Sequence, residues 1–270
     1  MRCGQIIPCT ALLLLVCNAS SPGQTGASQT QSGQEDTGHL KRPSKYSGPP
    51  VIGEFQRGEL ESAPDSDRRQ IREQSYADTN YPRQEAVDPG LLVNGQKETT
   101  NLRFIDYGMS GKLLDPRGIP VSVSTAVVVG TVTNGKCFVT KSHTYVYTDY
   151  LIRIDQILKQ DPTANLSVGD VVVAAREGGA IRFPSGHITN YLTADHGLPQ
   201  IGSQYVLFLS KSIPGFPEYE IMFDAGYQLK NGRVYPLDDV NSQYVGVDAS
   251  VFLDEVQKAI AASKKRGARQ

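Results

Sequence analysis

Six residues of types that bind ligands or carry catalysis lie within one stretch of twenty-one residues. The six are Arg176, Glu177, Arg182, His187, Asp195 and His196. Imidazole and carboxylate groups are common ligands of divalent metals, and guanidinium groups hold anions. We therefore take these six residues as the candidate ligand-binding residues of the chain.

The spacing of these residues matches no common metal-binding motif. The patterns H-E-x-x-H, C-x-x-C and H-x-H do not occur in the sequence. We expect no metal and no cofactor. The alternative to a ligand site is a polar loop at the mouth of a barrel, with His187 and His196 in solvent.

A small exported hydrolase is the alternative that uses this stretch for catalysis. Ser185 and His187 are close in sequence, but the G-x-S-x-G pattern of many serine hydrolases is absent. Glu177 and Asp195 are a permitted carboxylate pair for glycoside hydrolysis, as are many other pairs. The complete phosphate-binding pattern G-x-x-x-x-G-K-S/T is also absent. We assign no catalytic residue, and the sequence leaves enzymatic activity open without favouring it.

Two of the arginines flank a glycine pair. Arg176 and Arg182 lie on either side of Gly178-Gly179. Together they could hold an acidic ligand. Alternatively, they form ion pairs with Glu177 and neighbouring acidic residues at the surface, which is the commoner use of such charges.

The first nineteen residues resemble a secretory signal peptide. A short positive start at Met1 and Arg2 precedes an apolar run over 11–16, and Ala19 follows with a small-x-small pattern. The run is too short for a membrane span, which needs about 20 residues. We expect cleavage after Ala19 and a secreted, periplasmic or cell-envelope protein. Lipid anchoring at Cys17 is not expected, because Val16 stands where a small residue is required.

One cysteine remains after this leader. Cys137 lies in an apolar run with Phe138 and Val139. A single cysteine forms no disulfide within the chain, so the fold must rest on its own core. We expect Cys137 to be a small buried hydrophobic residue.

The composition divides the rest of the chain. Only ten of the seventy residues in 20–89 are large and apolar, without periodicity, so we expect a disordered linker. Residues 90–120 are expected to be an extended segment that leans on the folded domain. Residues 121–247 are expected to form that domain, because β-branched and aromatic residues gather there.

Strand signals dominate residues 121–247. Residues 144–158 alternate well. One face carries Val146, Thr148, Tyr150, Ile152, Ile154 and Leu158, and the other carries Tyr145, Tyr147, Asp149, Arg153 and Asp155. This period of two predicts a long strand with one buried side. The other predicted strands are 127–132, a short buried strand 171–173, 180–183 with 187–192, 204–209, 219–223, and a hairpin around Asn231-Gly232. With no helix between them, these strands predict a small OB-like β-barrel or sandwich.

The last residues, 248–270, have a helical pattern. Asp248 is suited to cap a helix, and Phe252, Val256 and Ile260 share one face. We expect a helix docked on the barrel and followed by a basic tail. A membrane-binding tail is the alternative, weakened by the acidic residues within the helix.

The order of these features resembles a family of exported bacterial all-β proteins of uncharacterised function. The matching residues are Val129-Gly130-Thr131-Val132, Tyr147-Thr148, Ile157-Leu158-Lys159, Gly169-Asp170, Gly178-Gly179 and Tyr205-Val206-Leu207-Phe208-Leu209. The strand order is also similar to the OB-type barrel of netrin-like and metalloproteinase-inhibitor domains. Those inhibitors act through a disulfide-held N-terminal cysteine that this chain lacks, so no residue role follows from the likeness.

These observations favour an exported, non-enzymatic binding or scaffold module whose ligand is a protein or a glycan. The net charge of −1 argues against nucleic acid as the partner. A purely structural envelope domain is a further alternative. The sequence leaves the oligomeric state and the identity of the partner open.

Overall fold

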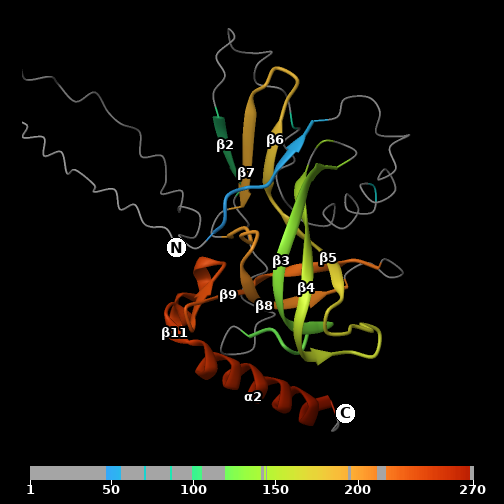
Figure 1. Ribbon diagram of the computed structural model, residues 1–270, viewed down its shortest axis with the longest axis vertical. Helices are drawn as coiled ribbons and strands as arrows, with labels where there is room; N and C mark the ends of the chain where they lie inside the picture. The colour runs from blue at the N-terminus through green and yellow to red at the C-terminus, as the bar shows by residue number, and fades with distance from the viewer. Residues whose placement is uncertain are drawn as a thin grey trace, which may run out of the picture. The chain divides into compact units, whose positions relative to one another are not determined.

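The alternating segment predicted at 144–158 is the central strand of the fold. In the computed structural model it is β4 (Val146–Gln160), which pairs on both sides with antiparallel neighbours (Figure 1). The structure describes residues 47–55, Gln70, Ala86, 99–104, 119–140, His143, 145–193, 196–211 and 217–267. The predicted leader 1–19 and most of the linker 20–89 lie outside the described residues. All described residues belong to one unit, Leu40–Gln270.

Five strands form a near-closed ring. β3 (Ala126–Val139), β4 and β5 (Val171–Glu177) are a consecutive antiparallel meander. β8 (Gln204–Ser210) pairs with β3, and β9 (Tyr219–Lys230) pairs with β8. A short parallel pairing of β5 with β9 brings the ring together. This connectivity is that of an OB-like barrel and confirms the predicted fold class.

Irregular pairing allows the two longest strands to curl around this ring. The register between β3 and β4 shifts at three places, one of them between Val129 and Gly130. Such bulges increase local twist and bend a strand. The bend that Gly130 predicted is therefore present. A side chain at this position would place its Cβ 2.7 Å from a methyl group of Ile152, which explains the glycine.

The interior of the ring is filled by alternate residues of its strands. The largest of these buried side chains are Tyr150, Ile152, Ile154, Tyr205, Leu207, Leu209 and Tyr219. The predicted inward face is thus confirmed for Tyr150, Ile152 and Ile154. At the end of the segment it changes sides, because Ile157 packs on the ring interior and Leu158 packs in the cluster at α2. Two details differ from the prediction. β5 is longer than 171–173, and its first residue, Val171, is 56% exposed rather than buried.

After the ring, the chain forms three short elements, a strand, a 3-10 helix and a second strand. β9 turns at Asn231-Gly232, both with positive φ, into β10 (Arg233–Pro236), as the hairpin signal predicted. The 3-10 helix η2 (Asp239–Tyr244) and β11 (Val247–Asp248) follow.

The predicted C-terminal helix is α2 (Ala249–Gly267), which lies along one side of the ring (Figure 1). The carboxylate of Asp248 accepts a hydrogen bond from the Ser250 N–H at 2.9 Å, so the predicted cap is present. Phe252, Val256 and Ile260 are buried against aliphatic and aromatic side chains of β3, β8 and β9. No described helix is both long enough and apolar enough to cross a membrane.

A second sheet of four strands packs beside the outer ends of β3 and β4. Its order is β1 (Ile52–Glu54), β6 (Gly179–Arg182), β7 (Ile188–Thr193) and β2 (Thr99–Phe104). The hairpin of β6 and β7 matches the predicted pair. The outer strands were not predicted. β1 comes from the expected linker, and β2 lies in the expected extended segment 90–120, of which residues 119 and 120 are also described.

Two glycines permit the close contact between this sheet and β3. A Cβ on Gly53 of β1 would lie 2.2 Å from the backbone oxygen of Cys137. A Cβ on Gly179 of β6 would lie 2.4 Å from the Cys137 sulfur. The other buried members of the apolar cluster between the two sheets are Ala86, Val139, Val146, Ile181, Phe183 and Tyr191, and Val51 and Phe55 pack against it.

Candidate functional site

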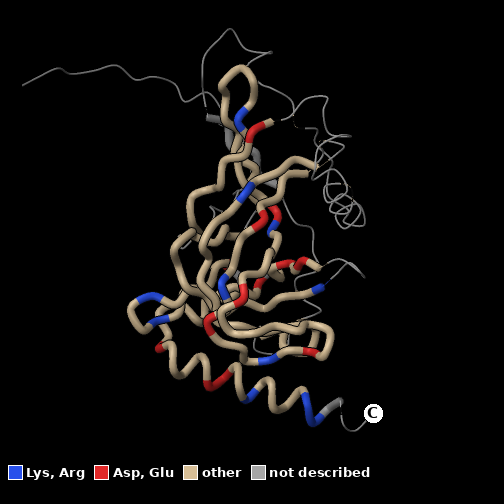
Figure 2. The backbone as a smooth tube through the Cα atoms, turned by 45° about the vertical axis from the view of Figure 1, so that its right-hand side comes forward, with Lys and Arg blue, Asp and Glu red and all other residues tan. Residues whose placement is uncertain are grey.

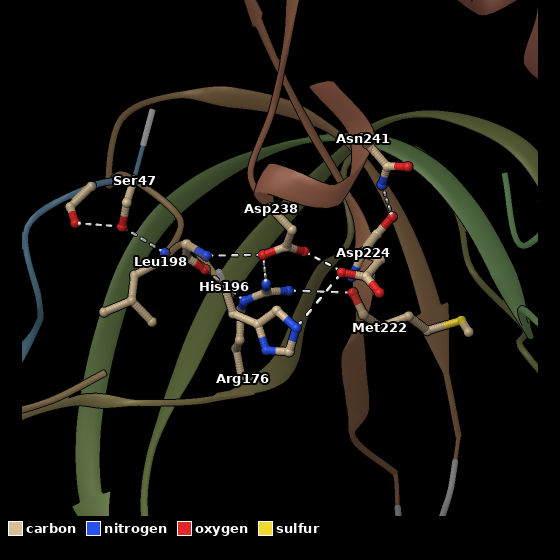
Figure 3. Close-up of polar contacts among 10 residues, drawn as sticks. Ser47, Arg176, His196, Leu198, Met222, Asp224, Asp238 and Asn241 are labelled. Carbon is tan, nitrogen blue, oxygen red and sulfur yellow. Dashed lines mark hydrogen bonds and ion pairs between the residues drawn. The ribbon is translucent and has the colours of Figure 1, made fainter. Parts of the chain in front are cut away.

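The buried guanidinium of Arg176 is the centre of a polar network inside the fold. Arg176 lies near the end of β5 and points into the ring (Figure 3). Its Nε donates to the Gly197 carbonyl at 2.7 Å and its Nη1 to the Met222 carbonyl at 3.2 Å. Its Nη2 donates to the Asp238 carboxylate. These donors are therefore directed at protein acceptors.

Asp238 joins three separate segments. Its Oδ1 accepts from Arg176 and from the Gly197 N–H at 2.9 Å. Its Oδ2 accepts from the Asp224 N–H at 2.8 Å. Since both partners of the Arg176–Asp238 ion pair are completely buried, each charge depends on the other for its stability.

His196 and Asp224 extend the network. His196 Nε2 lies 3.6 Å from Asp224 Oδ1, and both residues are buried. Asp224 has a φ of 58°, within β9. The Asn241 side chain donates to the Asp224 carbonyl and so holds this unusual backbone conformation from η2. These contacts hold β9 at Asp224 against His196, which follows β7, and against Asn241, which follows β10.

The six predicted residues occupy separate places. Arg176 and His196 belong to the buried network. Glu177, the next residue along β5, points to the opposite face. Arg182 forms an ion pair at 2.9 Å with Glu54 of β1, and both side chains are largely exposed. His187 is buried directly before β7.

Asp195 lies outside the described residues. His187 and His196 are buried, not in solvent as the alternative to a ligand site assumed, because each is enclosed by the fold. Among the residues that the structure describes, no three His, Cys, Asp or Glu side chains gather as a metal ion requires. The predicted ligand-binding role of the six residues stays a prediction.

Cys137 is buried between the two sheets, as expected. Burial raises the pKa of its thiol from 9.0 to about 12. The nucleophilic form of cysteine is the thiolate. Cys137 is therefore a packing residue rather than a reactive thiol.

The outer face of β3, β4 and β5 was not selected by sequence reasoning. Register partners point to the same side of a sheet, so each row of partners defines a strip across this face. The row nearest the second sheet joins Phe138 with Tyr147 and Glu177; the middle row joins Lys136 with Asp149 and Ala175. The next row joins Asn134 with Leu151 and Val173.

Burial changes abruptly between these rows. Asp149 is 4% exposed, whereas Leu151, two residues further along the same face of β4, is 37% exposed. On β5, Glu177 and Ala175 are buried, whereas Val173 is half-buried and Val171 is exposed. We call the first part the covered half of the outer face. We call the second part, with Leu151, Val171 and Val173, the open half.

A charged border lies beside the open half. Arg153 pairs with Val171 in register, and its Nε donates to Asp155 at 3.0 Å. Asp155 also accepts from Thr131 at 2.6 Å and from Gln204 at 2.9 Å. Burial alone would raise the pKa of Asp155, but these hydrogen bonds lower it. The carboxylate is therefore a fixed anion at the edge of an apolar strip.

Comparisons were made with protein-family models, curated proteins and solved structures. None of the three found a match. Residue roles in this chain must therefore be argued from its own geometry. One feature of the sequence could have indicated the outer face. Tyr145, Tyr147 and Asp149 occur on the same side of the long strand. That side was expected to face solvent, because tyrosine and aspartate are compatible with exposure.

Proposed function

We propose that this protein is an exported, non-enzymatic binding module that holds a protein partner on the open half of its outer face. The proposal rests on the aliphatic strip formed by the exposed Leu151 and Val171 and the half-buried Val173 on an OB-like ring. The face formed by the second and third strands is the one on which OB barrels bind oligonucleotides and oligosaccharides, and β4 and β5 are those strands here. A likeness to netrin-like domains remains part of this proposal and supplies no residue role.

The chemistry of the open half favours a protein over a glycan or a nucleic acid. Sugars and bases are usually held by stacking on exposed aromatic rings. The aromatic rings of this face, Phe138 and Tyr147, lie in the covered half. The open half is aliphatic with a charged border, which resembles the apolar centre and polar rim of a protein interface.

The charge distribution agrees with this choice. Lys and Arg residues are interspersed with Asp and Glu residues over the described elements (Figure 2). A nucleic-acid partner would be favoured by a concentrated basic surface. Mixed charges instead favour a partner that is recognised through shape and apolar contact.

The test is a charged substitution of the strip with a matched control. Leu151→Asp with Val171→Asp places two carboxylates in the open half. Val251→Asp with Ile201→Asp makes the same chemical change at two exposed aliphatic residues elsewhere. Each full-length protein is immobilised, exposed to an extract of the source cell envelope, and washed. The affinity of each retained protein is then measured after purification.

We expect a retained partner whose affinity falls at least tenfold, about 1.4 kcal/mol, for L151D/V171D and stays unchanged for V251D/I201D. Melting temperatures of the variants establish that they are folded. Equal affinity for all three proteins would contradict the proposal. Failure of the wild-type protein to retain any partner would contradict it as well.

A further inference from the structure

An asparagine on the outer face of β3 is in contact with the backbone of the glycine that follows it. Asn134 and Gly135 belong to the second half of β3, and the Gly135 N–H donates to Asn134 Oδ1 at 2.8 Å. The peptide nitrogen is therefore held against the side-chain amide of the residue before it. Such a contact favours a reaction within the chain, since proximity of two reacting groups replaces a collision between molecules.

We propose that Asn134 deamidates spontaneously in the folded protein and places a carboxylate in the open half of the outer face. The Gly135 nitrogen loses its proton to hydroxide and attacks Asn134 Cγ. A bond forms between that nitrogen and Cγ, the bond from Cγ to Nδ2 breaks, and the side-chain nitrogen leaves as ammonia with a proton taken from water. Water then opens the cyclic imide at either carbonyl, which gives aspartate or isoaspartate at position 134.

The backbone before Asn134 is irregular. The pairing of β3 with β4 shifts register between Val132 and Asn134, so Thr133 has no partner in the register. The Thr133 hydroxyl donates to the Leu151 carbonyl at 3.1 Å. Bulges bend and twist a strand locally. Ring closure needs such a departure from regular strand geometry, because the peptide nitrogen must turn toward the side chain of the preceding residue.

Gly135 carries no side chain that would shield its nitrogen from Asn134. A Cβ at this position would lie 3.0 Å from a methyl group of Val51 and 3.3 Å from the Tyr150 ring. The packing around β3 therefore favours glycine here, because the backbone is approached closely from both sides. The fold thus places the residue that hinders the attack least directly after Asn134.

The reacting groups are open to water. Asn134 is exposed and Gly135 is half-buried. Leu151, the register partner of Asn134 on β4, is 37% exposed. Hydroxide and water can therefore reach the Asn134 side chain, and ammonia can leave it.

The chain contains two other Asn-Gly pairs, and one of them provides an internal comparison. Asn94-Gly95 lies outside the described residues. Asn231 and Gly232 form the turn between β9 and β10, with φ values of 52° and 71°. A two-residue turn of this kind fixes both residues in the left-handed conformation, whereas imide formation needs rotation about the asparagine backbone. We therefore expect Asn231 to react more slowly than Asn134.

The two products change β3 in different ways. Aspartate keeps the backbone and adds a negative charge beside Leu151. Isoaspartate also inserts one carbon atom into the backbone of β3, just before the register pair of Lys136 with Asp149. The inference concerns the chemistry of the chain itself and does not depend on a partner of the open half.

Peptide mapping of the full-length protein tests the proposal. The folded protein is incubated in heavy-oxygen water at mildly alkaline pH and is then digested at acidic pH in ordinary water, which stops the reaction. Asparagine, aspartate and isoaspartate at positions 134 and 231 are resolved by chromatography and mass spectrometry. We expect labelled aspartate and isoaspartate at 134, formed at least fivefold faster than at 231. The rate should rise with pH, because the attacking nitrogen must lose its proton.

Three variants identify the reacting groups, and melting temperatures establish that each is folded. Gly135→Ala should slow the reaction at 134 at least tenfold, because the added methyl group shields the nitrogen. Asn134→Gln changes an exposed side chain and should keep its amide, because a longer side chain must close a larger ring. Asn231→Gln is the matched control and should leave the rate at 134 unchanged.

Three results would overturn the proposal. The first is asparagine that persists at 134 throughout the incubation, and the second is an equal rate at 134 and 231. The third is an unchanged rate at 134 in a folded G135A variant, or loss of the amide at an equal rate in N134Q.

Discussion

Arg176 of β5 and Asp238 of the segment before η2 form an ion pair in which neither side chain has any exposed surface (Figure 3). The pair joins two parts of the chain that are 62 residues apart in sequence. The Asp238 carboxylate also accepts hydrogen bonds from two backbone N–H groups. The network therefore joins distant parts of the chain through buried charges, and the removal of one charge would leave the other without its partner.

Removing one charge of this pair should be costly. Asp238→Asn keeps an acceptor for the backbone N–H groups but leaves the buried guanidinium without its anion. We expect a loss of about 3–5 kcal/mol in the free energy of unfolding, measured in urea. Arg176→Met combined with Asp238→Asn removes both charges and should lose less than the sum of the two single losses. Simple additivity of the two substitutions would contradict the coupling.

The contact between α2 and the ring should dominate the stability of that end of the molecule. The Phe252 ring lies 4.5 Å from the Tyr227 ring and 5.0 Å from the Tyr244 ring, measured between centroids. Phe252→Ala should lower the free energy of unfolding by about 3–5 kcal/mol. The adjacent Val251 is exposed, so Val251→Ala should change it by about 0.5 kcal/mol or less. Similar losses in the two variants would show that α2 is not docked.

Gly53 should be required for the docking of β1. A Cβ at this position meets the Cys137 carbonyl, and backbone yields less readily than a side chain. Gly53→Ala should therefore detach β1 and release the Ala180 amide, which donates to Val51 at 2.9 Å. Hydrogen exchange at Ala180 should accelerate strongly in G53A. It should remain slow in Ile52→Ala, which alters an exposed side chain of the same strand.

The protein should lose stability at alkaline pH. Burial raises the pKa of Cys137 from 9.0 to about 12, and burial also raises the pKa of Tyr150. The unfolded chain releases these protons at lower pH than the folded chain does. The stabilising contribution of Cys137 is therefore complete below pH 9 and is lost between pH 9 and about pH 12. The free energy of unfolding of Cys137→Ala should fall less between pH 8 and pH 10.5 than that of the wild-type protein; an identical fall would contradict the assignment.

The elements that local pattern determines were predictable. The alternation over 144–158, the Asn231-Gly232 turn and the apolar face around Phe252 each depend on neighbours in sequence, and each appears in the structure. The bend at Gly130 was indicated for the same reason, since glycine within a β-branched run marks an irregular strand.

The unpredicted features arise from contacts between distant residues. Strand β1 exists because the edge of β6 supplies its hydrogen-bonding partners, which a short run of three residues does not reveal. The role of Asp238 depends on Arg176 and Gly197, and no spacing in the sequence links them. The burial of Asp149 likewise contradicts its residue type, because a carboxylate on a strand face ordinarily indicates solvent.

The most direct test of the central claim, a divided outer face, is the rate of thiol labelling along it. Ala175→Cys, Val173→Cys, Leu151→Cys and Val171→Cys are made singly in a full-length chain whose Cys3, Cys9 and Cys17 are replaced by serine. Cys137 is retained, since it is buried between the sheets. We predict fast maleimide labelling at 151 and 171, an intermediate rate at 173, and a rate at least a hundredfold slower at 175. Equally fast labelling at all four positions would contradict the account.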